Sequence, residues 1–72
     1  MLKVLLFASL RERAGWDERS FPFTSELSTA RAVWDQLDLG PLEGISMAVN
    51  QEFVGPDQLL QAGDELAFLP PF

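Results

Sequence analysis

Apolar runs separated by short polar turns extend along the whole chain, and the spacing inside each run predicts its secondary structure. Residues 2–8 are nearly all apolar and predict a strand that is buried on one face. Strand alternation predicts that the inner face is formed by Leu2, Val4, Leu6 and Ala8. The outer face is then formed by Lys3, Leu5 and Phe7.

A second strand is predicted over residues 17–23, where apolar and polar positions alternate again. The polar residues 9–14 between the two strands can form a helical turn, and Gly15 allows the chain to reverse. Pro22 lacks the N–H that a central strand donates, so this second strand is expected at a sheet edge. The two strands together predict a hairpin.

Residues 29–38 have helical spacing, with Ser28 as the expected N-cap. The apolar stripe consists of Ala30, Val33, Trp34 and Leu37. Arg31 and Asp35 lie off this stripe at i and i+4, and we expect them to pair. Gly40-Pro41 marks the end of the helix. Trp34 is the largest residue on the stripe, and we expect it in one core with Val4, Leu6 and Phe68.

The second half of the chain predicts three strands, over residues 46–50, 52–54 and 66–69. Asn50-Gln51 is the expected turn between the first two, because Asn tolerates positive φ. Leu59 and Leu60 are expected to anchor the next loop on the core. Pro70-Pro71 ends the last strand and favours an extended path, which predicts a stiff arm leaving the body of the protein.

This order of elements predicts a single α+β domain over residues 1–72, a β-grasp (ubiquitin-like) roll. It has a mixed sheet of four to five strands with one main helix packed on one face. Nothing in the sequence covers the other face of the sheet. That face would expose Leu5, Phe7, Ala67 and Leu69, and an uncovered apolar patch on a small domain indicates a binding partner.

Charge is distributed unevenly along the 72 residues, whose net charge is −6. All five basic residues lie within the first 31 positions, and seven acidic residues with no base follow from Ala32 onward. The negative charge disfavours nucleic acid and anionic membranes as partners. An arm leaving an acidic half predicts a partner with a basic surface. With no apolar run of membrane-spanning length and no signal-peptide pattern, we expect a soluble, cytoplasmic protein.

The sequence offers no catalytic constellation. It has no cysteine and no histidine, which removes thiolate nucleophiles and the commonest general base and metal ligand. Asp64 and Glu65 are adjacent in a predicted strand and would point to opposite faces, so they are not a catalytic pair. We expect no metal site, no cofactor bound by this chain and no active-site side chain, although the chain can still serve an enzyme as a subunit.

Three stretches of the sequence, taken in order, resemble one protein family. The first is Lys3-Val4-Leu5-Leu6-Phe7-Ala8, followed by Leu10-Arg11-Glu12 and Gly15. The second is Ala48-Val49-Asn50-Gln51-Glu52-Phe53-Val54. The third is Gly63-Asp64-Glu65-Leu66-Ala67-Phe68-Leu69-Pro70-Pro71. Together they span nearly the whole chain and resemble the small subunit of molybdopterin synthase (molybdopterin-converting factor subunit 1).

The resemblance implies a sulfur carrier in molybdenum-cofactor synthesis. In this family an E1-like adenylating enzyme uses ATP to activate the C-terminal carboxylate, and sulfur then replaces AMP to give a thiocarboxylate. The tail inserts into the large subunit and donates sulfur to a cyclic pyranopterin. The resemblance therefore implies two protein partners. The residues expected to bind them are Leu5, Phe7, Ala67, Leu69, Pro70, Pro71 and Phe72.

The sequence departs from the family pattern at its end. Family members reach Gly-Gly a few residues after Pro-Pro, whereas this sequence ends at Phe72, one residue after Pro71. We expect the native chain to continue to Gly-Gly, because the rest of the pattern is kept. Two alternatives stay open, which are a non-carrying ubiquitin-like interaction module and a thiamine-type sulfur carrier. The thiamine-type carrier shares the fold but usually lacks the Pro-Pro exit.

The tail yields a first prediction. A chain that ends at Phe72 should dock but should not carry sulfur, because four further extended residues span roughly 10–14 Å, and displacements of even about 1 Å can cost roughly 100-fold in rate. The test incubates this chain, and one extended through Gly-Gly, with activating enzyme, ATP and a sulfur source. Mass spectrometry should find thiocarboxylate only on the extended chain, and its formation on the shorter one would contradict the Gly-Gly requirement.

Overall fold

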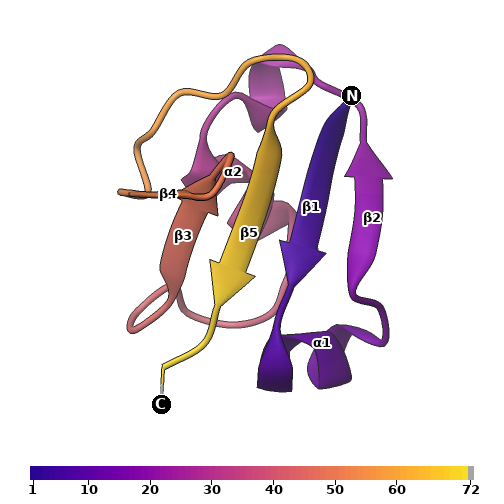
Figure 1. Cartoon of the computed structure of the whole chain (residues 1–72), viewed down its shortest axis with the longest axis vertical. Coiled ribbons are helices and arrows are strands. Elements are labelled where there is room, and N and C mark those ends of the chain that lie inside the picture. The colour runs from indigo at the N-terminus through magenta and orange to yellow at the C-terminus, as the bar shows by residue number, and fades with distance from the viewer. Residues whose placement is uncertain (72) are drawn as a thin grey trace.

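One five-stranded sheet carries the fold, and the computed structural model describes residues 1–71. The elements in chain order are β1 (Leu2–Leu6), α1 (Ala8–Ala14), β2 (Glu18–Phe21), the 3-10 turn η1 (Ser25–Leu27), α2 (Ala30–Leu37), β3 (Ser46–Val49), β4 (Glu52–Val54) and β5 (Glu65–Leu69). The strands lie side by side in the order β2-β1-β5-β3-β4 (Figure 1). The predicted β-grasp, with a mixed sheet and one main helix, is confirmed.

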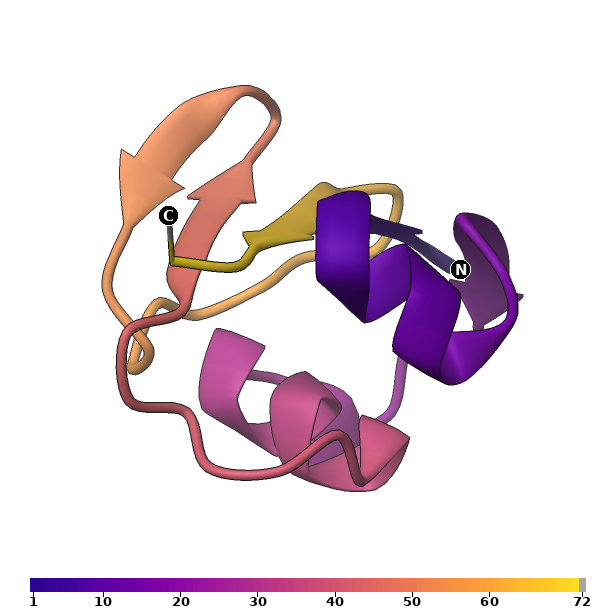
Figure 2. The ribbon, with the colours of Figure 1, turned by 90° about the horizontal axis from the view of Figure 1, so that it is seen from below.

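The first and last strands form the centre of the sheet. β1 and β5 are parallel, while the other three neighbouring pairs are antiparallel. Figure 2 shows α2 on one side of the sheet, as a two-layer arrangement requires. The edge position predicted for β2 from Pro22 is also confirmed.

Trp34 joins the helix to the sheet. Its side chain is 1% exposed, and its ring lies 5.1 Å from the ring of Phe68, centroid to centroid. The indole Nε1–H donates a hydrogen bond to the Gly40 carbonyl at 2.9 Å, so the only polar atom of the side chain is paired. Val4 and Leu6 belong to the same buried cluster, which confirms the predicted core.

The start of α2 differs from the prediction. Thr29, and not Ser28, is the N-cap, since its side chain accepts a hydrogen bond from the Ala32 N–H at 3.1 Å. Ser28 instead donates its hydroxyl to the Ser25 carbonyl in η1. The helix therefore starts one residue later than predicted. The Ser28 hydroxyl bonds back to η1, and the Thr29 hydroxyl bonds forward to the first turn of α2.

The expected pairing of Arg31 with Asp35 is wrong. Arg31 forms an ion pair with Asp57, with 3.2 Å between Nε and Oδ1. The backbone explains the change of partner, because the Arg31 N–H also donates to the Pro56 carbonyl at 2.8 Å. The loop after β4 therefore lies against the first turn of α2 and brings Asp57 within reach.

Only one of the two leucines expected to anchor this loop does so. Leu60 is buried, whereas Leu59 is 69% exposed. Leu59 forms an isolated antiparallel bridge with Thr29, and the Leu60 N–H donates to the Ser28 carbonyl. The segment is locally extended, so consecutive side chains point in opposite directions.

The turn predicted at Asn50-Gln51 is confirmed. Val49 pairs with Glu52, which leaves a two-residue connection, and both connecting residues have positive φ, of 50° and 72°. Two positive values are typical of the turn that matches the twist of a β-hairpin. The bounds of β3 and β4 follow from it.

Trp34 gives the stability prediction for the fold. Trp34→Ala should lower the free energy of unfolding by about 3–5 kcal/mol, because it removes a buried aromatic side chain that touches both layers. Urea denaturation measures the loss. Trp16→Ala, at a half-buried tryptophan, is the matched control and should cost clearly less. Equal losses for the two variants, or an unchanged Trp34→Ala protein, would contradict the assigned core.

Candidate functional site

The uncovered face of the sheet carries a row of apolar residues. The strand register places Leu5 beside Ala67, Ala67 beside Ala48, and Ala48 beside Phe53. We call these four residues the apolar row. They cross four neighbouring strands, β1, β5, β3 and β4. Leu5 and Ala67 alternate with the core residues Val4, Leu6, Leu66 and Phe68, so the row lies on the face away from that core. Figure 2 shows α2 on one side of the sheet.

Two members of the apolar row were predicted and two were missed. Leu5 and Ala67 are half-buried on the outer face, as expected. Phe53 was not predicted as a site residue, yet it is 76% exposed at the edge of the sheet. The sequence predicted the strand that contains Phe53. That Phe53 lies in one row with Leu5 depends on the order of the strands in the sheet, which the sequence did not show. Ala48 lies between Ala67 and Phe53 and is buried.

A second apolar feature surrounds the chain where it leaves β5. Phe7, Leu69, Pro70 and Pro71 line a hollow of about 260 Å³, together with Ala8 and Ser9. We call this the proline exit. The start of α1 and the end of β5 lie at the same end of the sheet (Figure 1). The structure thus brings together four of the seven predicted site residues, from both ends of the chain.

Phe7 reaches the proline exit by a route that the sequence did not predict. The strand ends at Leu6, whose partner is Phe68, and Phe7 is the N-cap residue of α1. Ala8 follows with φ of 50°, a left-handed conformation that is strained for a residue with a Cβ. The assignment of Phe7 to the sheet face and of Ala8 to the inner strand face is therefore wrong. Phe7 is 44% exposed and lies beside the exit.

The arm does not leave the body of the protein at once. Pro70 is half-buried and Pro71 is exposed. A Cβ on Gly44 would lie 3.4 Å from Cγ of Pro71, so the loop before β3 runs next to the proline ring. Gly44 also has φ of 80°, which favours glycine. Phe72, the last predicted site residue, lies outside the described residues.

The Gly63-Asp64-Glu65 motif holds the start of β5 in place. Asp64 accepts hydrogen bonds from the Gln61 N–H at 2.8 Å and from the Asn50 side-chain amide at 3.0 Å. The Asn50 side-chain oxygen accepts from the Glu65 N–H at 3.0 Å. These bonds tie the β3–β4 turn to the final strand, and they give the motif a structural role.

Within residues 1–71, no group of three or more acidic side chains is placed to hold a metal ion. The described core contains no buried polar or charged side chain. The apolar row and the proline exit are suited to binding another protein surface. None of the helices described in residues 1–71 combines the length and the apolar character needed to cross a membrane.

The chain matches the model of the ThiS family over residues 4–72. It is 40% identical to the molybdopterin synthase sulfur carrier subunit of Escherichia coli (strain K12), with 99% of this chain and 95% of that protein covered. It is 34% identical to the protein of the same name from Chlamydomonas reinhardtii, with 97% and 93% covered.

Solved structures agree with this fold. Two structures of small archaeal modifier protein 1 from Haloferax volcanii superpose with a TM-score of 0.81 at 28% identity. Each covers 99% of this chain, and 94% and 97% of those two chains are covered in turn. The similarity extends over the whole domain.

The hydrogen bonds of Asp64 yield a prediction. Asp64→Ala should lower the free energy of unfolding by about 1–3 kcal/mol, because two donors lose their acceptor. Thermal unfolding measures the change, and Glu43→Ala, at an exposed acid, is the control that should leave stability nearly unchanged. If Asp64→Ala were as stable as the parent chain, the structural role of the motif would be wrong.

Proposed function

This chain belongs to the ThiS family, and from that premise we propose that it is the sulfur carrier subunit of a molybdopterin synthase. The observation that supports this most strongly is the full-length similarity to two molybdopterin synthase sulfur carrier subunits. The apolar row across the sheet and the proline exit after β5 are consistent with it. We further propose that the protein works in the cytoplasm.

The proposed reactive group is the C-terminal carboxylate, so the absence of cysteine and histidine is no obstacle. An E1-like adenylating enzyme would join the carboxylate to AMP from ATP, with release of pyrophosphate. A sulfur donor would then displace AMP and leave a thiocarboxylate. This chain contributes no side chain to either step. Its part is to present the tail.

How well the tail is presented to a partner depends on how rigid the preceding strand β5 is. β5 lies between β1 and β3, and Phe68 next to the exit is fully buried. The two proline rings restrict φ directly after the strand. Less conformational freedom is then lost when the tail enters a partner, which favours binding. The buried strand β5 and the two prolines after it thus support the proposal that the C-terminal carboxylate is presented to a partner in one restricted direction.

We propose that the large subunit of the synthase contacts the apolar row and the proline exit together. A protein interface needs an apolar centre that excludes water, and these two features supply one. The adenylating enzyme must reach the same terminus. The two partners are therefore proposed to bind in turn and not together.

A thiamine-type sulfur carrier is the second candidate, because the matching family model is that of ThiS. The Pro70-Pro71 exit and the two relatives named above favour the molybdopterin role. The acceptor protein discriminates between these functions. The chain, extended through Gly-Gly and charged as thiocarboxylate, is offered either the molybdopterin synthase large subunit with its pyranopterin or the thiamine-pathway acceptor. Sulfur transfer only to the thiamine acceptor would overturn the proposal.

Phe7 gives the interface prediction. Phe7→Asp should leave the fold intact, because the side chain is 44% exposed, and should abolish measurable association with the large subunit. The reason is that a carboxylate would be buried in an apolar contact without a partner. Isothermal titration calorimetry measures the association, and circular dichroism checks the fold.

Phe23→Asp is the matched control for this variant. Phe23 is 39% exposed, nearly the same as Phe7, but it follows β2 and does not line the proline exit. We expect Phe23→Asp to bind the large subunit like the parent chain. Normal binding by Phe7→Asp, or equal loss in both variants, would show that the proline exit is not the interface.

A further inference from the structure

The open edge of β2 lies at the far side of the sheet from the apolar end at Phe53, and no strand of the described residues pairs with it (Figure 1). We propose that this edge and the groove between β2 and α2 form a second docking site. Its occupant is an extended, apolar segment of another protein that carries acidic residues, and it binds as an added strand. The inference does not depend on the sulfur-carrier function.

The backbone at this edge is available for pairing. The Leu6 N–H donates to the Asp17 carbonyl at 2.9 Å, and Val4 pairs with Arg19 in the same ladder. Antiparallel strands direct alternate residues toward the partner, so Glu18 and Ser20 direct their N–H and C=O groups away from β1. Pro22 follows and offers no donor, which limits the edge to these two residues. A short segment is therefore sufficient to pair with the free backbone groups of this edge.

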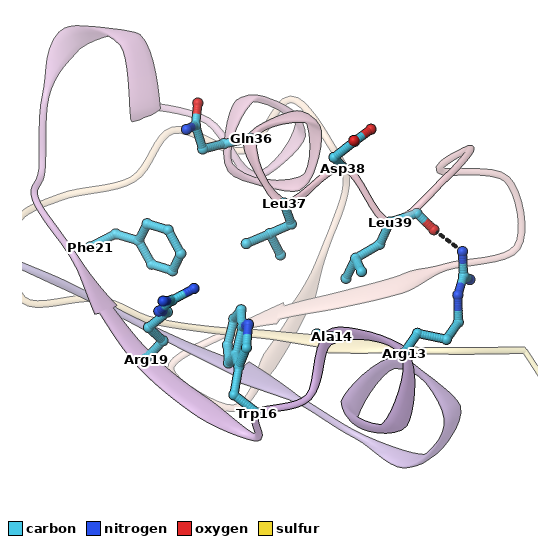
Figure 3. Close-up of a pocket in the computed structure, with 9 residues that line it drawn as sticks. All are labelled: Arg13, Ala14, Trp16, Arg19, Phe21, Gln36, Leu37, Asp38 and Leu39. Carbon is cyan, nitrogen blue, oxygen red and sulfur yellow. Dashed lines mark hydrogen bonds between the residues drawn. The ribbon is translucent and has the colours of Figure 1, made fainter.

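The groove beside this edge has a volume of about 470 Å³. Figure 3 shows its lining, with Trp16 and Phe21 on the β2 side and Leu37 on the α2 side. Both aromatic residues are half-buried, and their ring centroids are 6.1 Å apart. A strand added to β2 would point every second side chain into this groove, because side chains alternate between the two faces of a sheet. Trp16, Phe21 and Leu37 thus offer contacts to apolar side chains at alternate positions, within a lining that is otherwise mostly polar.

The charged side chains that line the groove indicate which kind of segment binds there. The guanidinium of Arg19 lies 5.5 Å from the ring centroid of Trp16, an arrangement that orients the group and leaves its N–H edges free for a carboxylate. Arg13, whose guanidinium donates to the Leu39 carbonyl, lies at the other end of the groove (Figure 3). Asp38 is the one acidic residue of the lining. Two of the five basic residues of a chain with net charge −6 thus line one groove, which favours an acidic segment.

The test uses the whole chain, labelled with nitrogen-15, and a synthetic peptide. The peptide has four alternating valine and isoleucine residues flanked on each side by two glutamates. We expect the amide resonances of Glu18 and Ser20 to shift on titration and to become protected from hydrogen exchange. A second peptide carries N-methyl groups on alternate central amides, so that it cannot donate to the β2 edge. It should lose the binding.

Charge is tested separately. Arg13→Glu and Arg19→Glu, combined, should weaken binding of the acidic peptide by about tenfold or more. A peptide with lysine flanks should show the opposite preference for the two proteins. Arg31→Glu is the control, since Arg31 lies in the first turn of α2, pairs with Asp57 and does not line the groove, and it should bind the acidic peptide like the parent chain.

Three outcomes would overturn the inference. One is the absence of binding to the parent chain at about 1 mM peptide. Another is equal binding of the N-methylated peptide, which would show that no strand is added. The third is a set of shifts confined to the outer face around Leu5 and Phe53. The first two use the unmodified protein, so they hold even if the charge-reversed variant fails to fold.

Discussion

The contact between Trp34 and Phe68 is the interaction on which the rest of the structure depends. It packs α2 against β5. β5 lies next to β1, and these two strands form the only parallel pair of the described sheet. A parallel pair needs a long crossover, and here the crossover contains α2 itself. The helix, the central strands and the exit of the tail are therefore held by one cluster, and loss of its largest member affects all three.

Packing the helix on one side of the sheet leaves two different surfaces for partners. The outer face has the apolar row, and Leu69, which lines the proline exit, follows its member Ala67 by two residues on β5. The groove beside the edge of β2 lies on the helix side and is lined by Arg13 of α1 and Arg19 of β2. Apolar burial dominates the first surface, while backbone pairing and positive charge dominate the second. As proposed above, separate surfaces would allow two partners of different chemistry to bind the same fold.

Three features were predicted incorrectly or missed, two of them because they depend on residues distant in the sequence. Arg31 pairs with Asp57 because the loop after β4 folds back onto α2, which no i, i+4 rule contains. Phe7 leaves the strand because Ala8 adopts positive φ, a conformation that sequence statistics do not predict for alanine. Phe53 joins the apolar row only through the order of β1, β5, β3 and β4.

The sequence by itself determined the types of the elements, their order and the core, because hydrophobic periodicity is a local property that each segment carries independently. It also identified the apolar end of β5 and the Pro70-Pro71 segment after it, since two prolines restrict the backbone wherever they occur. The hollow that Phe7 completes beside them came from the tertiary structure. Only the tertiary structure decided which residues from different strands share a face. Register and strand order result from pairing between distant segments, and a change of one residue in register would move every side chain of a strand to the other side.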